Sequence, residues 1–192
     1  MITDLKQHLT ERFVNFDVHR PFIDEQECKA TFLLYNLSGK IVGKQQYNPN
    51  ASKSKSNDVY GRYITIRTEF QNTQTVFGLE TFNWHSTKTI FVTEGIFDAT
   101  RITWFKDECC IALLGNSTNP KEGYKSWLKS LGRKTVAVCD SDRAGLQLVK
   151  LTDCAIILDP KHGKDLGECS IDVVHNVINL GHELSCNERI NV

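Results

Sequence analysis

Two aspartates lie one residue apart in the segment VAVCDSDRAG, directly after a run of small apolar residues. Asp140 and Asp142 carry like charges, and at this separation each raises the pKa of the other. Such a pair needs a compensating positive group, which a helix N-terminus, a cationic side chain or a bound metal ion can supply. A single Asp-x-Asp before a helix is also typical of ordinary N-capping, so the pair alone leaves both interpretations open.

Further carboxylates follow other apolar runs. Glu94 ends the run TIFVTE, Asp98 comes one helical turn later, and Asp165 follows the run CAIILD. Because the carboxyl ends of parallel strands meet at one edge of an open α/β sheet, we expect these groups to lie together. Carboxylate oxygens are the ligands that Mg²⁺ prefers beside water and phosphate oxygens. The sequence therefore predicts a Mg²⁺ or Mn²⁺ site, suited to phosphate chemistry, whose ligands are Glu94, Asp98, Asp140, Asp142 and Asp165.

The elements that must position these groups alternate between two types. Apolar runs typical of buried strands cover residues 89–94, 109–115, 134–140 and 154–159. Helical patterns follow them at residues 95–105, 121–132, 142–151 and 169–181, the second and the last ending in glycine. This alternation predicts a parallel four-stranded sheet with flanking crossover helices, and the continuous apolar character of the strands predicts that both faces of the sheet are covered.

The first part of the chain has a different pattern. It predicts a helix over residues 2–13, a β-hairpin over 30–47, a polar loop over 48–58, a strand over 60–66, and a turn with one more short strand over 76–82. The change of pattern predicts two units, a small α+β subdomain at residues 1–86 and an α/β domain at residues 87–192.

Charge and cysteine content narrow the class of protein. The formal net charge is zero, so binding to nucleic acid would need a local basic face. The seven cysteines include no C-x-x-C pair, which argues against a structural zinc site. Their odd number and the lack of a signal peptide predict a reducing cytoplasm, and no apolar run is long enough to span a bilayer, so we expect no membrane partner.

A local basic face is expected between Lys40 and Arg67, where six basic residues accompany one acid, Asp58. This excess suits a groove for single-stranded nucleic acid or a nucleoside triphosphate. The alternative is that the basic residues form an ordinary solvated face of the hairpin, without a ligand. Within this segment Lys44 and Arg62 are the candidate phosphate contacts. Lys161 and Lys164, beside the acidic turn near the end of the chain, are two more.

Four segments resemble the motifs of the Toprim domain, and within that family they are most similar to the catalytic cores of bacterial and phage primases: TEGIFDA, LLGNST, CDSDRAG and HGKDLGE. The segments SGKIVGKQQY, GRYITI and VFGLE resemble, more loosely, the small domain that precedes Toprim in those cores. The resemblance implies a Toprim fold after a primase-like α+β subdomain. The matched motifs also contain candidate nucleotide contacts at Gly95, Asn116 and Arg143.

The resemblance implies metal-dependent nucleotidyl transfer that makes short RNA primers on single-stranded DNA, in the replication of a phage or mobile element. Glu94, Asp140 and Asp142 are the implied catalytic residues, and single-stranded DNA and ribonucleoside triphosphates the implied partners. The sequence has neither a cysteine-rich zinc ribbon nor a Walker-A loop, so a separate helicase or zinc-module protein is a further expected partner. A Toprim nuclease and a non-catalytic nucleic-acid-binding module of replication or repair stay open, because the same carboxylates serve hydrolysis and transfer.

Overall fold

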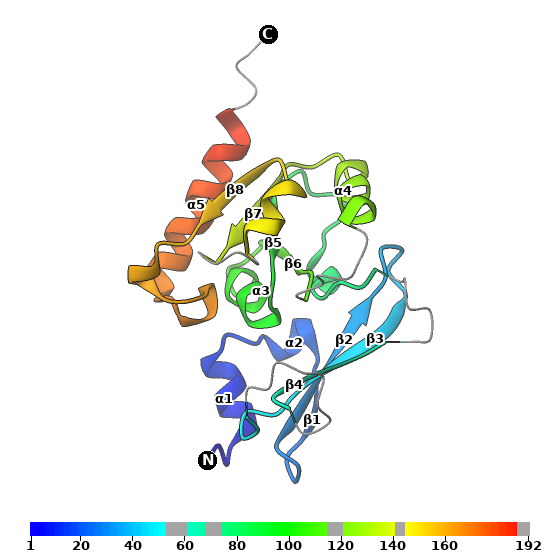
Figure 1. The fold of residues 1–192 in the computed structure, drawn as a ribbon, viewed down its shortest axis with the longest axis vertical. Helices are drawn as coiled ribbons and strands as arrows, with labels where there is room; N and C mark the ends of the chain where they lie inside the picture. Colours follow the sequence, from blue (N-terminus) through cyan, green and yellow to red (C-terminus); the bar gives the residue numbers. More distant parts are fainter. Residues whose placement is uncertain (53–60, 68–73, 115–120, 141–144, 188–192) are drawn as a thin grey trace.

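The computed structural model describes residues 1–52, 61–67, 74–114, 121–140 and 145–187. It contains two four-stranded sheets, an antiparallel one in the first part of the chain and a parallel one in the second (Figure 1). A parallel sheet with flanking helices after a smaller α+β part confirms the predicted fold class. The division into domains at residue 86 stays a prediction.

The antiparallel sheet has the strand order β1-β2-β3-β4. Its strands are β1 (Phe22–Asp24), β2 (Lys29–Tyr35), β3 (Ile41–Tyr47) and β4 (Tyr63–Arg67). β2 and β3 form the expected hairpin, in which the Asn36 side chain accepts hydrogen bonds from the backbone N–H groups of Ser38 and Lys40. Strict alternation along β2 buries Ala30, Phe32 and Leu34 on one face, so that face is the inner one.

Two short helices precede this sheet, α1 (Leu5–Glu11) and α2 (Phe16–His19). The first is shorter than the predicted 2–13 because the Asp4 carboxylate accepts a hydrogen bond from the N–H of Gln7 at 2.8 Å, which places the N-cap at Asp4. The sequence pattern did not predict α2 or β1, which have four and three residues and are too short to show a period.

The parallel sheet has the strand order β6-β5-β7-β8. Its strands are β5 (Ile90–Thr93), β6 (Cys109–Ala112), β7 (Thr135–Cys139) and β8 (Cys154–Ile157), and its helices are α3 (Ile96–Thr103), α4 (Lys121–Ser130) and α5 (Ile171–Asn187). Buried side chains of α3 and α5 pack on one face, and those of α4 pack on the other, so both faces are covered as predicted. No helix in the described ranges is long and apolar enough to cross a membrane.

Two predicted elements differ from the structure. Residues 142–151 were expected to form an α-helix, but their described part forms the 3₁₀ helix η2 (Gly145–Lys150). The chain must return at once to β8, and the Asp153 side chain accepts hydrogen bonds from the backbone N–H and the hydroxyl of Thr135, which fixes that return. In residues 76–82 the expected strand is reduced to two isolated bridges, followed by η1 (Leu79–Thr81).

These bridges connect the two sheets. Val76 pairs with Tyr35 of β2, and Phe77 pairs with Ala112 of β6. A single apolar cluster continues from one part to the other and includes Leu9 and Phe32 together with Phe97 and Leu166. The two sheets therefore share one core, and the junction between them is packed with apolar side chains.

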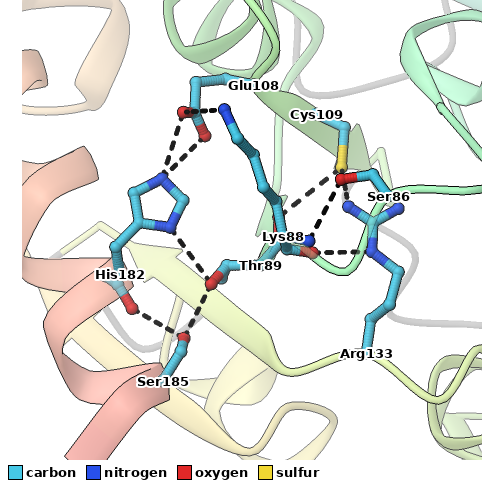
Figure 2. A network of polar contacts seen from close by, with 9 residues as sticks. Ser86, Lys88, Thr89, Glu108, Cys109, Arg133, His182 and Ser185 are labelled. Carbon is cyan, nitrogen blue, oxygen red and sulfur yellow. Dashed lines mark hydrogen bonds and ion pairs between the residues drawn. The ribbon is translucent and has the colours of Figure 1, made fainter.

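The last helix runs further than the sequence predicted. The pattern placed its end at Gly181, but α5 continues to Asn187. A Cβ at position 181 would lie 2.8 Å from Cζ of Phe91, so this glycine allows close packing on β5 and does not end the helix. The turns beyond it are held by polar contacts (Figure 2): Ser185 with Thr89 at 2.9 Å, and His182 Nε2 with Glu108 Oε2 at 3.0 Å.

This packing gives a first prediction. Gly181→Ala should lower the free energy of unfolding by about 1–2 kcal/mol, because overpacking against the Phe91 ring outweighs the higher helix propensity of alanine. Urea denaturation followed by circular dichroism measures the effect. Asn179→Ala, on the exposed face of the same helix, is the matched control and should be neutral or slightly stabilising. Equal stability of Gly181→Ala and wild type would contradict the packing role of Gly181.

Candidate active site

A pocket of about 320 Å³ is lined by residues of the antiparallel sheet and by residues at the carboxyl end of β5. The second part of the chain contributes Glu94, Gly95, Asp98 and Asp165, which the sequence had singled out. The first part contributes Arg12, Gln45 and Tyr63, and the lining is completed by Ile96, Phe97 and Leu114. The pocket is therefore composite, with acidic groups from one part of the chain facing a cation and an aromatic ring from the other.

Asp98 is buried at the base of this pocket and joins two segments of backbone. Its Oδ2 accepts a hydrogen bond from the N–H of Gly95 at 3.1 Å, and its Oδ1 accepts one from the N–H of Gly167 at 2.9 Å. The pKa of Asp98 is raised to about 7. Burial is the main cause, and the negative charges of Asp165 and Asp140 contribute in the same direction. Asp98 thus links the start of α3 to η4 (Leu166–Glu168), and its role as a metal ligand stays a prediction.

Arg101 holds the same segment from the next turn of α3. Its Nη2 donates to the carbonyl of Gly167 at 2.7 Å, its Nη1 donates to the carbonyl of Cys169, and its guanidinium lies 4.3 Å from the ring centroid of Phe13. Asp98 binds the N–H group of Gly167 and Arg101 binds its carbonyl group. Together they fix this segment and so place the nearby Asp165 at the pocket. Sequence reasoning missed Arg101, although its spacing of three residues from Asp98 puts both on one helical face.

Glu94 and Asp140 follow β5 and β7 at the expected edge of the sheet. Glu94 is half-buried and lines the pocket, whereas Asp140 is half-buried and close enough to raise the pKa of Asp98. Between them Gly95 begins α3, and a Cβ there would lie 2.8 Å from the Asp98 carboxylate, so a larger residue would disturb this contact. Asp142, Asn116 and Arg143, which were also predicted site residues, lie outside the described residues.

The donor set has the chemistry of a magnesium site but is not a closed cage. Within the part of the chain that the structure describes, no three His, Cys, Asp or Glu side chains are grouped closely enough to hold a metal ion. Mg²⁺ normally takes only one or two protein carboxylates and completes its coordination with water and substrate phosphates. Glu94 and Asp165, which line one pocket, therefore fit an ion of this type that is shared with a phosphate-bearing substrate.

Arg12 is the cation of the pocket, and the sequence did not indicate it. Its guanidinium carbon lies 3.8 Å from the ring centroid of Phe97, and its Nε is buried without a hydrogen-bond partner. Among the residues described, it forms no ion pair with a carboxylate. Its carbonyl accepts a hydrogen bond from the Thr100 hydroxyl at 3.1 Å, which ties the end of α1 to α3. The stacked guanidinium is thus positioned to meet an anion.

Aromatic rings form the wall beside Arg12. The ring of Tyr63 lies 5.2 Å from that of Tyr47 and 6.4 Å from that of Phe97, measured between centroids. Burial raises the pKa of Tyr63 to about 12, so its hydroxyl stays protonated at neutral pH. The residue is 36% exposed and lines the pocket.

Of the five predicted basic contacts, the four that the structure describes do not line this pocket, and Arg143 lies outside the described residues. Lys44 lies on the face of β3 opposite to Gln45, paired with Leu33 and Ile66. Arg62 donates from Nε to the carbonyl of Ala51 at 3.1 Å. Lys161 forms an exposed ion pair with Asp159 at 2.7 Å, and the backbone N–H of Lys164 donates to Glu168. Their contacts with nucleic acid stay predictions, and any such contacts would extend beyond the pocket.

Comparison with known proteins places this geometry in a known fold. No family model and no curated protein matches the sequence. Among solved structures, the zinc-binding and RNA polymerase domains of the Aquifex aeolicus primase match over 80% of this chain and 40% of that one, with 18% identity and a TM-score of 0.57. The DnaG primase catalytic domain bound to ssDNA matches over 94% of this chain and 58% of that one, with 16% identity and a TM-score of 0.59.

A phage protein has the same fold. The primase fragment of the bacteriophage T7 primase-helicase protein matches over 88% of this chain and 76% of that one, with 14% identity and a TM-score of 0.53. At such identities the comparisons establish the fold alone, which is that of primase catalytic cores. The resemblance seen in the sequence motifs is confirmed at this level. This chain spans only about half the length of the first two structures that it matches.

The buried carboxyl gives a second prediction. Because the pKa of Asp98 rises from 3.8 to about 7 on folding, the folded protein retains a proton that the unfolded chain has released. The contribution of this group to stability is therefore fully present below about pH 4 and is lost as the pH rises through 7. Without divalent ions, wild type should lose roughly 2–3 kcal/mol more stability between pH 5 and pH 8 than Asp98→Asn does.

Urea denaturation in the presence of a chelator, repeated across this pH range, measures the difference. Asp172→Asn removes an exposed carboxylate at the start of α5 and should keep the wild-type pH dependence. Parallel pH profiles for wild type and Asp98→Asn would show that the buried carboxyl does not titrate in this range.

Proposed function

We propose that this chain is a primase-like nucleotidyl transferase that joins ribonucleotides into short RNA primers on single-stranded DNA, in the replication of a phage or mobile element. The observation that carries the proposal is the composite pocket, in which Glu94 and Asp165 face Arg12 and Tyr63. The fold of primase catalytic cores supports it, and one of the matched structures contains bound ssDNA.

In the proposed reaction, the 3′-hydroxyl of one ribonucleotide attacks the α-phosphorus of the next, a new P–O bond forms, and pyrophosphate leaves with the electrons of the broken bond. Glu94 is the group that would accept the proton of the attacking hydroxyl. Arg12 would bind the triphosphate by charge and by its fixed, stacked orientation. Phosphoryl transfer depends mainly on such positioning and on charge neutralisation.

A magnesium or manganese ion would be held by Glu94, Asp98, Asp140, Asp142 and Asp165, and it would neutralise the phosphate oxygens and orient them. Asp98 also accepts the N–H groups of Gly95 and Gly167, so it would position the neighbouring ligands Glu94 and Asp165 as well. The closely spaced carboxylates, whose charges raise the pKa of Asp98, are the feature of this chain that supports cation binding.

Template binding is proposed for the basic side chains between Lys40 and Arg67, of which Lys44 and Arg62 do not line the pocket. A short segment of this kind holds a template weakly, and a loosely held template loses much of the advantage of proximity. A separate helicase or zinc-module protein is therefore proposed as the partner that delivers or grips the template. We expect slow synthesis by the pure protein and faster synthesis when such a partner is added.

The third prediction tests the reaction itself. With labelled ribonucleotides, single-stranded DNA and Mg²⁺ or Mn²⁺, wild type should produce short extended products on a denaturing gel, and Glu94→Gln should lower their yield at least about a hundredfold, as expected for a residue that acts as general base. Glu183→Gln, an exposed glutamate on α5, is the matched control and should retain full activity.

The same gel separates the alternatives. Labelled DNA that is only shortened, with or without partners, would replace the proposal by the nuclease. Binding of single-stranded DNA with neither extension nor shortening would leave a non-catalytic binding module.

The fourth prediction concerns the cation of the pocket. Arg12→Leu should raise the nucleoside triphosphate concentration for half-maximal binding by about tenfold or more, since hydrogen bonds to charged groups are roughly this strong. Arg12→Lys should recover only part of the affinity, because the ammonium group cannot stack on Phe97 as a planar guanidinium does. Arg20→Leu, an exposed arginine, is the control for loss of charge. Unchanged affinity in Arg12→Leu, measured by calorimetry, would contradict the assignment.

A further inference from the structure

Gln45 places a buried amide in the wall of the pocket. The residue is 9% exposed and lies on the inner face of β3, where it pairs with Thr65 of β4. Its Nε2 donates a hydrogen bond to the Thr65 hydroxyl at 2.9 Å. In the part of the chain that the structure describes, no donor contacts its Oε1. The amide is thus held through its Nε2 by Thr65, and its Oε1 is an acceptor for a ligand in the pocket.

Such a fixed acceptor recognises a hydroxyl or an N–H group of the molecule in the pocket. A site built around a fixed hydrogen-bonding group discriminates against an analogue that lacks the partner, because the group is then left unpaired in the complex. The acceptor lies in the same pocket as the Arg12 guanidinium and the Tyr63 ring. The guanidinium suits the phosphate of a nucleotide and the ring suits its base. The Gln45 acceptor suits a hydrogen-bond donor on the base or on the sugar.

The choice between base and sugar follows from the proposed function, on which this inference rests. A pocket that copies a template must accept all four bases, so a fixed protein acceptor can serve only a group that all four nucleotides share. The 3′-hydroxyl is the next nucleophile and must reach the carboxylates. The 2′-hydroxyl remains as the partner of the amide.

We propose that Gln45 is a specificity-determining residue that selects ribonucleotides over deoxyribonucleotides, with its Oε1 accepting a hydrogen bond from the ribose 2′-hydroxyl. Thr65 is the positioning residue that holds the amide in this orientation. The ring of Tyr63, partly exposed and supported by Tyr47 and Phe97, provides a surface on which any base can stack.

The experiment compares the binding of ATP and 2′-deoxy-ATP to the intact protein by calorimetry in Mg²⁺. Wild type should bind ATP about three- to tenfold more tightly, which is the range for one neutral hydrogen bond. Gln45→Leu keeps the approximate size of the side chain but removes the acceptor. It should bind the two nucleotides equally, through weaker binding of ATP and unchanged binding of 2′-deoxy-ATP.

Gln46→Leu is the matched control, because this neighbouring glutamine points to the opposite face of β3, where it pairs with Thr31 and Ile64. It should leave the preference unchanged. Thr65→Val should reduce the preference without a loss of affinity for 2′-deoxy-ATP, since the released amide can rotate. Circular dichroism confirms that each variant is folded.

Equal binding of both nucleotides by wild type, or an unchanged preference in Gln45→Leu, would overturn the inference and leave the proposed function standing. A preference for ATP that depends on Gln45, in a protein that extends no primer, would support the inference and contradict the proposed function. If wild type binds neither nucleotide, both fail.

Discussion

The candidate site depends on one buried carboxyl group. Asp98 accepts hydrogen bonds from Gly95 and Gly167, and so it fixes the two backbone segments that carry Glu94 and Asp165. Burial of this group among other acids is costly, as its raised pKa shows, and the cost is tolerated because two N–H groups are satisfied at the same time. Arg101 completes the arrangement from the same helix, where it binds the carbonyls of the second segment.

The opposite wall of the pocket depends on aromatic and cation–π packing in addition to hydrogen bonds. The Arg12 guanidinium rests on the ring of Phe97, and Phe97 is itself held by Phe32 and Tyr47 of the antiparallel sheet. This sheet therefore supports the cation and the aromatic surface, while the parallel sheet supports the acids. Because both belong to one apolar core, the distance between the two walls is set by side-chain packing.

Much of the fold could be predicted from the sequence, because the strands of the parallel sheet are continuous apolar runs and three of the four, β5, β7 and β8, are followed by a carboxylate. Local sequence patterns gave a wrong prediction where tertiary packing determines the role of a residue. Gly181 is typical of a helix end, yet it makes room for Phe91 inside α5. Arg12 could not be identified as a site residue, since nothing in its local sequence shows that it lies on Phe97. The spacing of Arg101 from Asp98 indicates a shared helical face, but it does not show that Arg101 binds backbone carbonyls far along the chain.

The composite pocket also has a consequence for biosynthesis. Arg12 and Asp165 are 153 residues apart in the sequence (165 − 12), so the walls of the pocket meet only after the chain has left the ribosome beyond Asp165. The antiparallel sheet and α1 emerge first, and the apolar cluster that they share with α3 and η4 is completed only when those later elements are made. Contacts between such distant residues form late and slow the folding of a domain. A nascent or truncated chain that stops before Asp165 therefore contains no assembled site, because one of the acids that face the arginine is missing.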